Sequence, residues 1–277
     1  MKKVNKRVIP GFGLSLGVTL SLLSIIVLIP LASLVIYTAN MDFGEIIDTI
    51  TRKRVLASFE VSFITALIAS LINAVMGVIL AWVLVRYDFP FKRVLDGMIE
   101  LPFALPTAVA GIALTSLTAD TGIIGKFFGN FGIKIAYTRI GIVVALVFIG
   151  IPFVVRAVQP VLEKLDSSYE EAGVALGASR LRIFWKIIFP EIKPAVFTGF
   201  GLAFGRCLGE YGSVVFIAGN QPYKTEITPL IIMSELQEYD YASATAIALV
   251  MLLASFLILF LVNLIQIRNA KILKGGN

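Results

Sequence analysis

Long apolar runs recur along this 277-residue chain, and they limit what it can fold into. Each run is close to the ~20 residues that an α-helix needs to cross the hydrocarbon core of a bilayer. Hydrophobic residues make up 58% of the chain and charged residues only 15%, an excess of apolar surface that a soluble domain of this length has no use for. The sequence therefore predicts an all-α integral membrane protein.

Six transmembrane helices are expected. The first apolar run follows a basic segment, as the core of a secretory signal peptide does. It is longer than the ~7–15 apolar residues of such a signal, and more runs follow, so we interpret it as a retained first span. The expected spans cover about residues 11–37, 61–85, 99–117, 140–158, 194–218 and 242–267. The loops between them at 41–59, 119–138 and 220–240 are expected on one side, the first as a loop or a surface helix.

The basic residues predict the orientation. Most of them lie in the two end segments, in the turn at 86–97 and in the segment between the fourth and fifth spans. Because cytoplasmic loops carry an excess of Lys and Arg, both chain termini are expected in the cytoplasm. The net charge of +6 is explained in the same way and needs no nucleic-acid partner. The basic residues of the two ends are Lys2, Lys3, Lys6, Arg7, Arg268, Lys271 and Lys274.

Several kinds of chemistry find no support in the sequence. The chain has no histidine and a single cysteine, Cys207, which argues against a zinc site, a haem site and an internal disulfide. It also has no Gly-x-x-x-x-Gly-Lys phosphate loop and no recognisable pairing of a nucleophile with a base. No metal and no catalytic residue is therefore predicted.

A polar segment, Ser167 to Pro190, interrupts the apolar pattern. Ser167 precedes Glu170 by three residues, and Ser168 precedes Glu171 by the same spacing, so either pair predicts a capping box at a helix start. Downstream, basic residues interleave with aromatic and aliphatic ones, as in a helix that lies on a membrane surface.

Two glycines of this segment, Gly173 and Gly177, are four residues apart, which would place them on one helix face. Glycine lowers helix stability, so this spacing predicts the close approach of another surface. The alternative is an ordinary loop helix with chance glycines. Pro190 is expected to end the helix.

Charged residues also occur inside an apolar run. Arg206 and Glu210 lie in the expected fifth span, where charges are costly and usually pair or face a polar interior. Their spacing allows them to pair on one helix face. Two interpretations remain open: a purely structural ion pair, or an anion pathway in which Arg206 supplies positive potential and Glu210 holds it in place.

The third expected span contains Pro102 and Pro106, followed by Thr107. Prolines leave backbone carbonyls without a partner, which lipid cannot satisfy, so this part should face other helices or a wet cavity. A plain proline kink in a structural helix is an equally open interpretation.

The polar segment resembles the EAA loop of ABC-importer permeases. The resemblance rests on Glu171-Ala172-Gly173, then Gly177, and on Ile187 and Pro190 at their fixed spacing. It implies a helix that docks on a separate ATPase and couples ATP-driven closure to transport. The residues expected to make this contact are Glu170, Glu171, Ala172, Gly173, Leu176, Gly177 and Ala178.

Four further blocks narrow the resemblance. LPFALPTAVAG, IPFVVRAVQPVLE, LGEYGSVVFIAGN and LQEYDYASA are similar to the T-type permease subunits of bacterial sulfate/thiosulfate ABC importers, and the likeness extends over nearly the whole chain. Molybdate and tungstate permeases share much of the sequence of the third and fifth spans. An importer of molybdate or tungstate is therefore the first alternative, a passive anion channel the second, and an intramembrane enzyme the third.

The resemblance implies a type I ABC importer permease fold in a bacterial inner membrane. It divides the chain into an N-terminal tail, first helix and external segment (1–58), a five-helix transporter domain (59–268) with its coupling loop at 160–193, and a cytoplasmic tail (269–277). The implied partners are a W-type permease subunit, two copies of an ATPase subunit, an extracytoplasmic binding protein and membrane lipid. ATP and magnesium would bind the ATPase, and this chain would bind no cofactor.

Overall fold

The computed structural model describes the backbone of residues 11–274 and the side chains of residues 11–264, and every regular element in that part is a helix. The basic residues of the first ten positions, and the side chains of Arg268, Lys271 and Lys274, lie outside it. In chain order the elements are α1 (Phe12–Leu23), the π-helical η1 (Ser24–Leu28), α2 (Ile29–Ala39), α3 (Phe43–Thr51), α4 (Lys53–Arg86), α5 (Lys92–Ile99), α6 (Leu101–Ala104), α7 (Thr107–Thr118), α8 (Ile123–Gly129), α9 (Arg139–Lys164), α10 (Ser168–Ala175), α11 (Arg180–Ile183), the π-helical η2 (Phe184–Ile188), α12 (Phe189–Leu208), α13 (Val214–Ile217), α14 (Thr228–Gln237) and α15 (Tyr241–Lys274).

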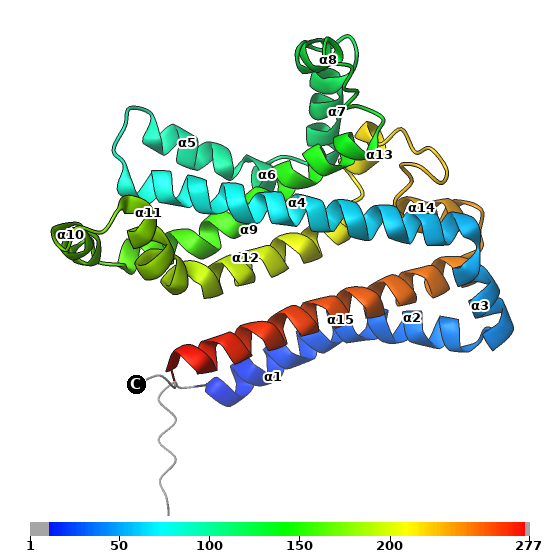
Figure 1. The fold of residues 1–277 in the computed structure, drawn as a ribbon. Helices are drawn as coiled ribbons and strands as arrows, with labels where there is room; N and C mark the ends of the chain where they lie inside the picture. Colours follow the sequence, from blue (N-terminus) through cyan, green and yellow to red (C-terminus); the bar gives the residue numbers. More distant parts are fainter. Residues whose placement is uncertain (1–10, 275–277) are drawn as a thin grey trace, which may run out of the picture.

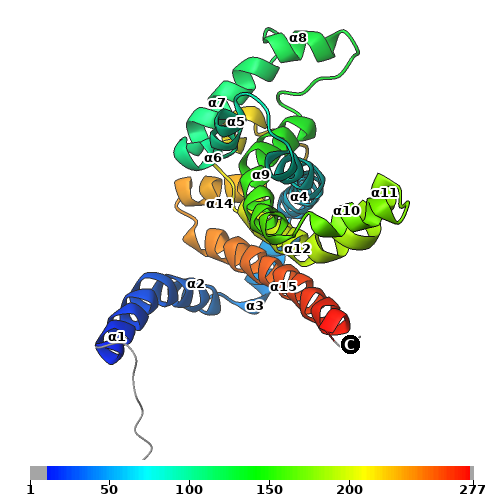
Figure 2. The ribbon, with the colours of Figure 1, turned by 90° about the vertical axis from the view of Figure 1, so that its left-hand side faces the viewer.

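Three long helices, α4, α9 and α12, form the centre of the molecule and pack along one another (Figure 1). Their facing sides hold most of the buried apolar side chains, in two clusters. Seen from the end that carries α10 and α11, α15 lies beside this centre and α1 and α2 lie at the periphery (Figure 2). The first apolar run, Phe12–Ala39, is almost wholly exposed along its length, as a helix that faces lipid would be.

Glycines allow the central helices to come close at Val154 of α9. A Cβ atom on Gly77 of α4 would lie 2.7 Å from the Val154 Cβ, and one on Gly199 of α12 would lie 2.7 Å from the Val154 Cα. No side chain can occupy either position without displacing a helix, because real Cβ atoms do not approach so closely. Small residues at helix contacts are the usual means of tight packing in membranes.

The long apolar helices agree with most of the expected spans. Among the described residues, five helices are long and apolar enough to cross a membrane, and a sixth span arises if α7 and α8, which meet at a bend of 43°, count as one. The expected spans near residues 11–37, 61–85, 140–158 and 242–267 each coincide with one of the five over most of their length. The chain is therefore a multi-pass membrane protein.

The expected third span, residues 99–117, is wrong as a continuous helix. The chain there forms α5, α6 and α7, with a break at Leu105 and Pro106. Leu105 is extended (φ −90°, ψ 137°), as a residue before proline tends to be, because the proline ring disfavours the helical conformation of its predecessor. After this break α7 and α8 turn away from the direction of α4 (Figure 1).

Other boundaries also differ. α4 begins at Lys53, so the expected division between residues 58 and 59 falls inside a continuous helix. The expected fifth span ends earlier than residue 218, because α12 stops at Leu208 and a turn leads into α13. Loops 119–138 and 220–240 contain α8 and α14.

Both ends of the described chain lie at the same end of the bundle as α10 and α11, whereas α3 and α14 lie at the opposite end (Figure 1). An even number of membrane crossings requires this arrangement. Whichever side of the membrane holds α10 and α11 therefore also holds both ends.

The contact at Val154 predicts the effect of adding a methyl group. Gly199→Ala should lower stability by about 1–3 kcal/mol, because the methyl group meets backbone that cannot move aside. Thermal unfolding in detergent measures this as a lower midpoint. Gly97→Ala is the matched control, since nothing lies within 4 Å of its added Cβ, and its midpoint should stay the same or rise. An unchanged midpoint for Gly199→Ala would contradict the packing described.

Candidate functional site

The expected coupling loop at 160–193 includes the ends of α9 and α12, and between them the chain folds into a helical hairpin of α10 and α11; from here on the name coupling loop is kept for this hairpin, residues 165–188. An aspartate begins it: the backbone N–H of Ser168 donates to the Asp166 carboxylate at 3.0 Å. Hydrogen bonds from Ser168 lower the pKa of Asp166, so its carboxylate is ionised at neutral pH and stabilises the helix start.

The expected capping boxes are wrong. Ser167 has helical backbone angles (φ −61°, ψ −20°), whereas a capping serine is extended, and it makes no side-chain cap. Its hydroxyl instead lies 3.4 Å from the Glu171 carboxylate. Asp166 performs the role that the sequence assigned to the serines.

The prediction that Gly173 and Gly177 share a helix face is also wrong. α10 ends at Ala175, and Gly177 lies beyond it with φ +75°, in the left-handed region. The N–H of Ala178 donates to the Gly173 carbonyl (3.0 Å) and that of Gly177 to the Val174 carbonyl (2.9 Å), which is the Schellman arrangement of a helix end. Gly177 therefore terminates α10 and lets the chain reverse into α11.

Gly173 is buried against the other half of the hairpin. A Cβ atom there would lie 2.9 Å from Ile183 Cγ1. The chain's own fold thus accounts for both glycines. On the outside of the hairpin, Glu171 and Ala172 are exposed, and Leu176 at the tip is 88% exposed.

Pro190 does not end a helix, in contrast to the prediction. The helical path from Arg180 to Leu208 is continuous and contains Pro190 in the first turn of α12. A π-helical turn, Phe184–Ile188, directly precedes it. The wider turn accommodates a residue that cannot donate the usual backbone hydrogen bond. The coupling loop is consequently joined to a core helix without a break.

The expected ion pair within the membrane is present. Arg206 Nη2 lies 2.7 Å from Glu210 Oε2, and Glu210 is 1% exposed. The two residues do not share a helix, because α12 ends before Glu210. The second carboxylate oxygen accepts hydrogen bonds from the N–H (2.8 Å) and the hydroxyl (3.0 Å) of Ser213. Glu210 thereby fixes both Arg206 and the turn after α12.

The start of α7 packs on that same turn. Thr107 Oγ1 occupies the space where a side chain on Gly212 would lie, and a Cβ on Gly111 would lie 2.7 Å from the Ser213 Cα. The structure therefore brings Thr107 to the turn that Glu210 holds. It places Pro102 in α6, which packs against α9, and leaves Pro106 exposed at the helix break.

Arg206 also borders a cavity of about 460 Å³ between α12, α9 and α15. Its side chain is 36% exposed, so part of the guanidinium is available beyond the contact with Glu210. Thr198 and Asn263 add polar groups to a lining that is otherwise apolar or glycine. Arg206 is the one charged side chain among the described residues that line this mainly apolar cavity.

Several ion pairs were not anticipated, because their partners are far apart in sequence, and three arginines illustrate them. Arg86 at the end of α4 pairs with Glu170 of the coupling loop (2.9 Å). At the opposite end of the bundle, Arg54 donates two hydrogen bonds to the buried Glu226. The third, between α9 and α5, joins Arg156 to Asp96 and Glu100, each at 2.7 Å. No local spacing signals such contacts.

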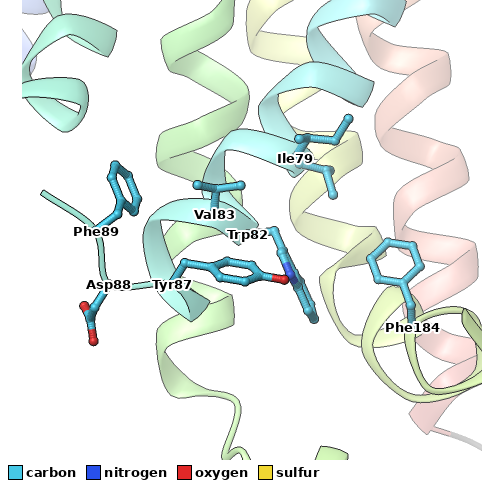
Figure 3. A pocket seen from close by; sticks show the side chains of 8 residues that line it. Ile79, Trp82, Val83, Tyr87, Asp88, Phe89 and Phe184 are labelled. Atoms are coloured by element: carbon cyan, nitrogen blue, oxygen red, sulfur yellow. The ribbon is translucent and has the colours of Figure 1, made fainter. Parts of the chain in front are cut away.

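An apolar cavity of about 580 Å³ lies where α4 approaches the coupling loop. Figure 3 shows Trp82 and Tyr87 of the α4 end on one side and Phe184 of η2 on the other. Trp82 and Phe184 meet edge to face, with ring centroids 5.7 Å apart. Aromatic contact therefore accompanies the Arg86–Glu170 pair at the junction of loop and core.

Comparison of the sequence with known proteins identifies the family to which it is similar. The family profile described as "Binding-protein-dependent transport system inner membrane component" matches residues 73–271. The sulfate transport system permease protein CysT of Salmonella typhimurium is 49% identical over 271 residues, which cover 98% of each chain. The Escherichia coli protein of the same name is 48% identical with the same coverage.

Solved structures agree on the fold. A bacterial ABC transporter involved in the import of alginate superposes with a TM-score of 0.77 at 15% identity, covering 93% of this chain and 96% of that one. The alginate transporter in complex with a periplasmic protein that holds an alginate pentasaccharide also gives 0.77, at 16% identity, covering 96% and 98%. The fold is that of an ABC importer permease.

The chain therefore belongs to the family of binding-protein-dependent transport system inner-membrane components. These are transport proteins, not enzymes. Within that family, its relatives along nearly the full length are sulfate permeases.

The Gly173 contact predicts that the hairpin opens when the glycine is enlarged. Gly173→Val should raise the rate of trypsin cleavage after Arg180 and Arg182 several-fold, because the added side chain displaces Ile183 and loosens the helical backbone around these two exposed arginines. Adding Ile183→Ala to this variant should restore much of the resistance.

Ala172→Val is the matched control, since Ala172 neighbours Gly173 on α10 but is exposed. It should leave the cleavage rate unchanged. Equal rates for Gly173→Val and the unaltered chain would show that the hairpin does not depend on this packing.

Proposed function

We propose that this chain is the permease subunit of an ATP-driven importer of sulfate and thiosulfate. The observation that carries the proposal is its identity of nearly one half, over 98% of both chains, to permeases named for sulfate transport. Because the match covers 98% of each chain, it includes the membrane helices and the coupling loop alike. An importer of molybdate or tungstate remains the alternative, since those oxyanions are also tetrahedral.

The coupling loop supplies the expected contact with an ATPase. Its outer side presents an acidic residue, Glu171, beside the small Ala172 and the exposed Leu176. An exposed leucine at the tip of a rigid hairpin suits insertion into a pocket of a partner protein. We assign the docking role to this outer face, with Gly173 and Gly177 shaping it from within and Glu170 holding it to α4.

The proposed assembly contains a W-type permease subunit, two ATPase copies and an extracytoplasmic binding protein. ATP and magnesium would bind the ATPase copies, and no cofactor is assigned to this chain. With the loop facing the ATPase, both chain termini lie in the cytoplasm of a bacterium and the chain spans its inner membrane. The alginate transporter structure offers an example of an ABC transporter in complex with a periplasmic protein.

Alternating access follows from the way the loop is attached. When two ATPase copies close on ATP, the docked loop is displaced, and α12 moves with it because the helical path between them is unbroken. α12 packs against α4 and α9, so the displacement reaches the membrane core as a rigid-body movement. Hydrolysis would reverse it.

Arg206 is our candidate for contact with the anion. Glu210 neutralises it at rest, which offsets the cost of a charge at this depth. A divalent oxyanion entering the neighbouring cavity could take over part of the guanidinium while Glu210 keeps its two hydrogen bonds to Ser213. Thr107, Pro102 and Pro106 would then shape the neighbouring helix break.

The transport test uses cells that lack their own sulfate uptake, supplied with this chain and its neighbouring subunits. Labelled sulfate should accumulate in an ATP-dependent manner, and unlabelled thiosulfate should displace it whereas molybdate should not. Displacement by molybdate alone would show that the transported anion is molybdate, and the proposal of an ATP-driven importer would still stand. Uptake that persists without the ATPase would indicate a passive channel and overturn the proposal.

The two roles of Arg206 can be separated. Arg206→Ala should lower uptake at least tenfold and also lower stability, because Glu210 is left buried and unpaired. The double variant with Glu210→Gln removes that buried charge and should recover most of the thermal midpoint while uptake stays low. Recovery of both would leave Arg206 only a structural role.

A further inference from the structure

The second half of the coupling loop packs into the membrane core, because Ile183 and Ile188 belong to the same buried apolar cluster as Leu84 of α4, whereas α10 has fewer links to the core. The two ends of the loop continue from α9 and into α12, and inside the hairpin Gly173 packs on Ile183. Among the residues whose side chains are described, one ion pair joins α10 to a helix that is distant in sequence, namely α4. That ion pair is the contact between Glu170 and Arg86.

Arg86 makes three contacts at once. Its Nε donates to Glu170 Oε1 at 2.9 Å, and its Nη2 donates to the backbone carbonyl of Leu165 at 3.0 Å. Its guanidinium lies over the Trp82 ring, 5.8 Å from the centroid. Arg86 therefore connects the end of α4 to both the start of the loop and its first helix.

The surroundings make this contact firmer than a surface salt bridge. The side chains of Arg86 and Glu170 are 17% and 25% exposed, so water screens them only in part. The planar guanidinium fits the fork of two acceptors and the aromatic face, and a lysine could not reproduce that geometry. The three contacts fix the direction of Arg86 and, through it, the position of α10.

We propose that Arg86 is a positioning residue for energy coupling: it fastens the ATPase-facing loop to α4, so that loop and core move together. Resting on the proposed function, this inference assigns the transmission of movement to a residue outside the EAA-like segment. α4 receives the displacement directly at its end, in parallel with the continuous path into α12. Without Arg86, α10 loses its ion pair to α4 and is positioned only through its packing on the other half of the hairpin, so that it follows α4 less closely.

The assembled transporter tests this in proteoliposomes, as sulfate moved per ATP hydrolysed. Arg86→Gln and Glu170→Gln should each lower that ratio by about tenfold, the range expected from loss of a charge-assisted hydrogen bond. Arg86→Lys should recover only part of it. Arg93→Gln is the matched control, an exposed arginine near the same end of the bundle with no ion pair among the described residues, and it should behave like the unaltered protein.

A charge exchange separates positioning from general folding. Arg86→Glu and Glu170→Arg should each impair coupling, and the double variant should recover part of it, since the pair is restored with opposite polarity. The hydrogen bond from Arg86 to the Leu165 carbonyl is still lost in the double variant, so the recovery of coupling stays incomplete. If either single variant fails to assemble with its partner subunits, the yield of assembled transporter is compared among the single and double variants instead. A double variant that assembles no better than the single variants would overturn the proposal.

Hydrogen exchange of the α10 amides provides a readout that does not depend on transport. Arg86→Gln should speed this exchange at least several-fold relative to α9. If Arg86→Gln speeds the exchange but the unaltered transporter moves no sulfate, the proposed substrate is wrong, whereas the link between Arg86 and α10 is supported. An unchanged exchange rate together with an unchanged transport ratio would overturn the link itself.

Discussion

Close contact of three helices at Val154 is the constraint on which the rest of the structure depends. Gly77 and Gly199 allow α4 and α12 to approach α9 from two sides, at distances that exclude any side chain. In a membrane, where lipid is as apolar as the helices, such packing replaces the hydrophobic effect as the source of association. The coupling loop is continuous with α12 of this three-helix unit, and the displacement that we propose for the loop requires the unit to be stiff.

The sequence was most informative where structure depends on length and composition. Apolar runs predicted most of the spans, and the EAA-like residues located the coupling loop. The ion pair of Arg206 and Glu210 followed from a short spacing. Long-range contacts had no such signal: Arg86 meets Glu170, and Arg54 meets Glu226, only because the helices bring them together.

Where local reasoning failed, a competing local rule was responsible. Leu105 and Pro106 break the third span because the residue before a proline avoids the helical region. Gly177 was read as part of a helix face, whereas its positive φ makes it a terminator. Pro190 was expected to end a helix, and a π-helical turn accommodates it. Each of these three errors concerns a glycine or a proline, whose effect depends on the conformation around it.

One distance tests most directly whether loop and core move as one body. Spin labels at Val174 of α10 and Met76 of α4, both exposed, can be placed in a variant whose native cysteine is replaced, Cys207→Ala. In the assembled transporter the distance between the labels should stay the same with and without bound ATP, while the distance from Val174 to the ATPase partner's opposite copy shortens. A change between the two labels of about 5 Å or more, the rise of one helical turn, would contradict a rigid link between loop and core.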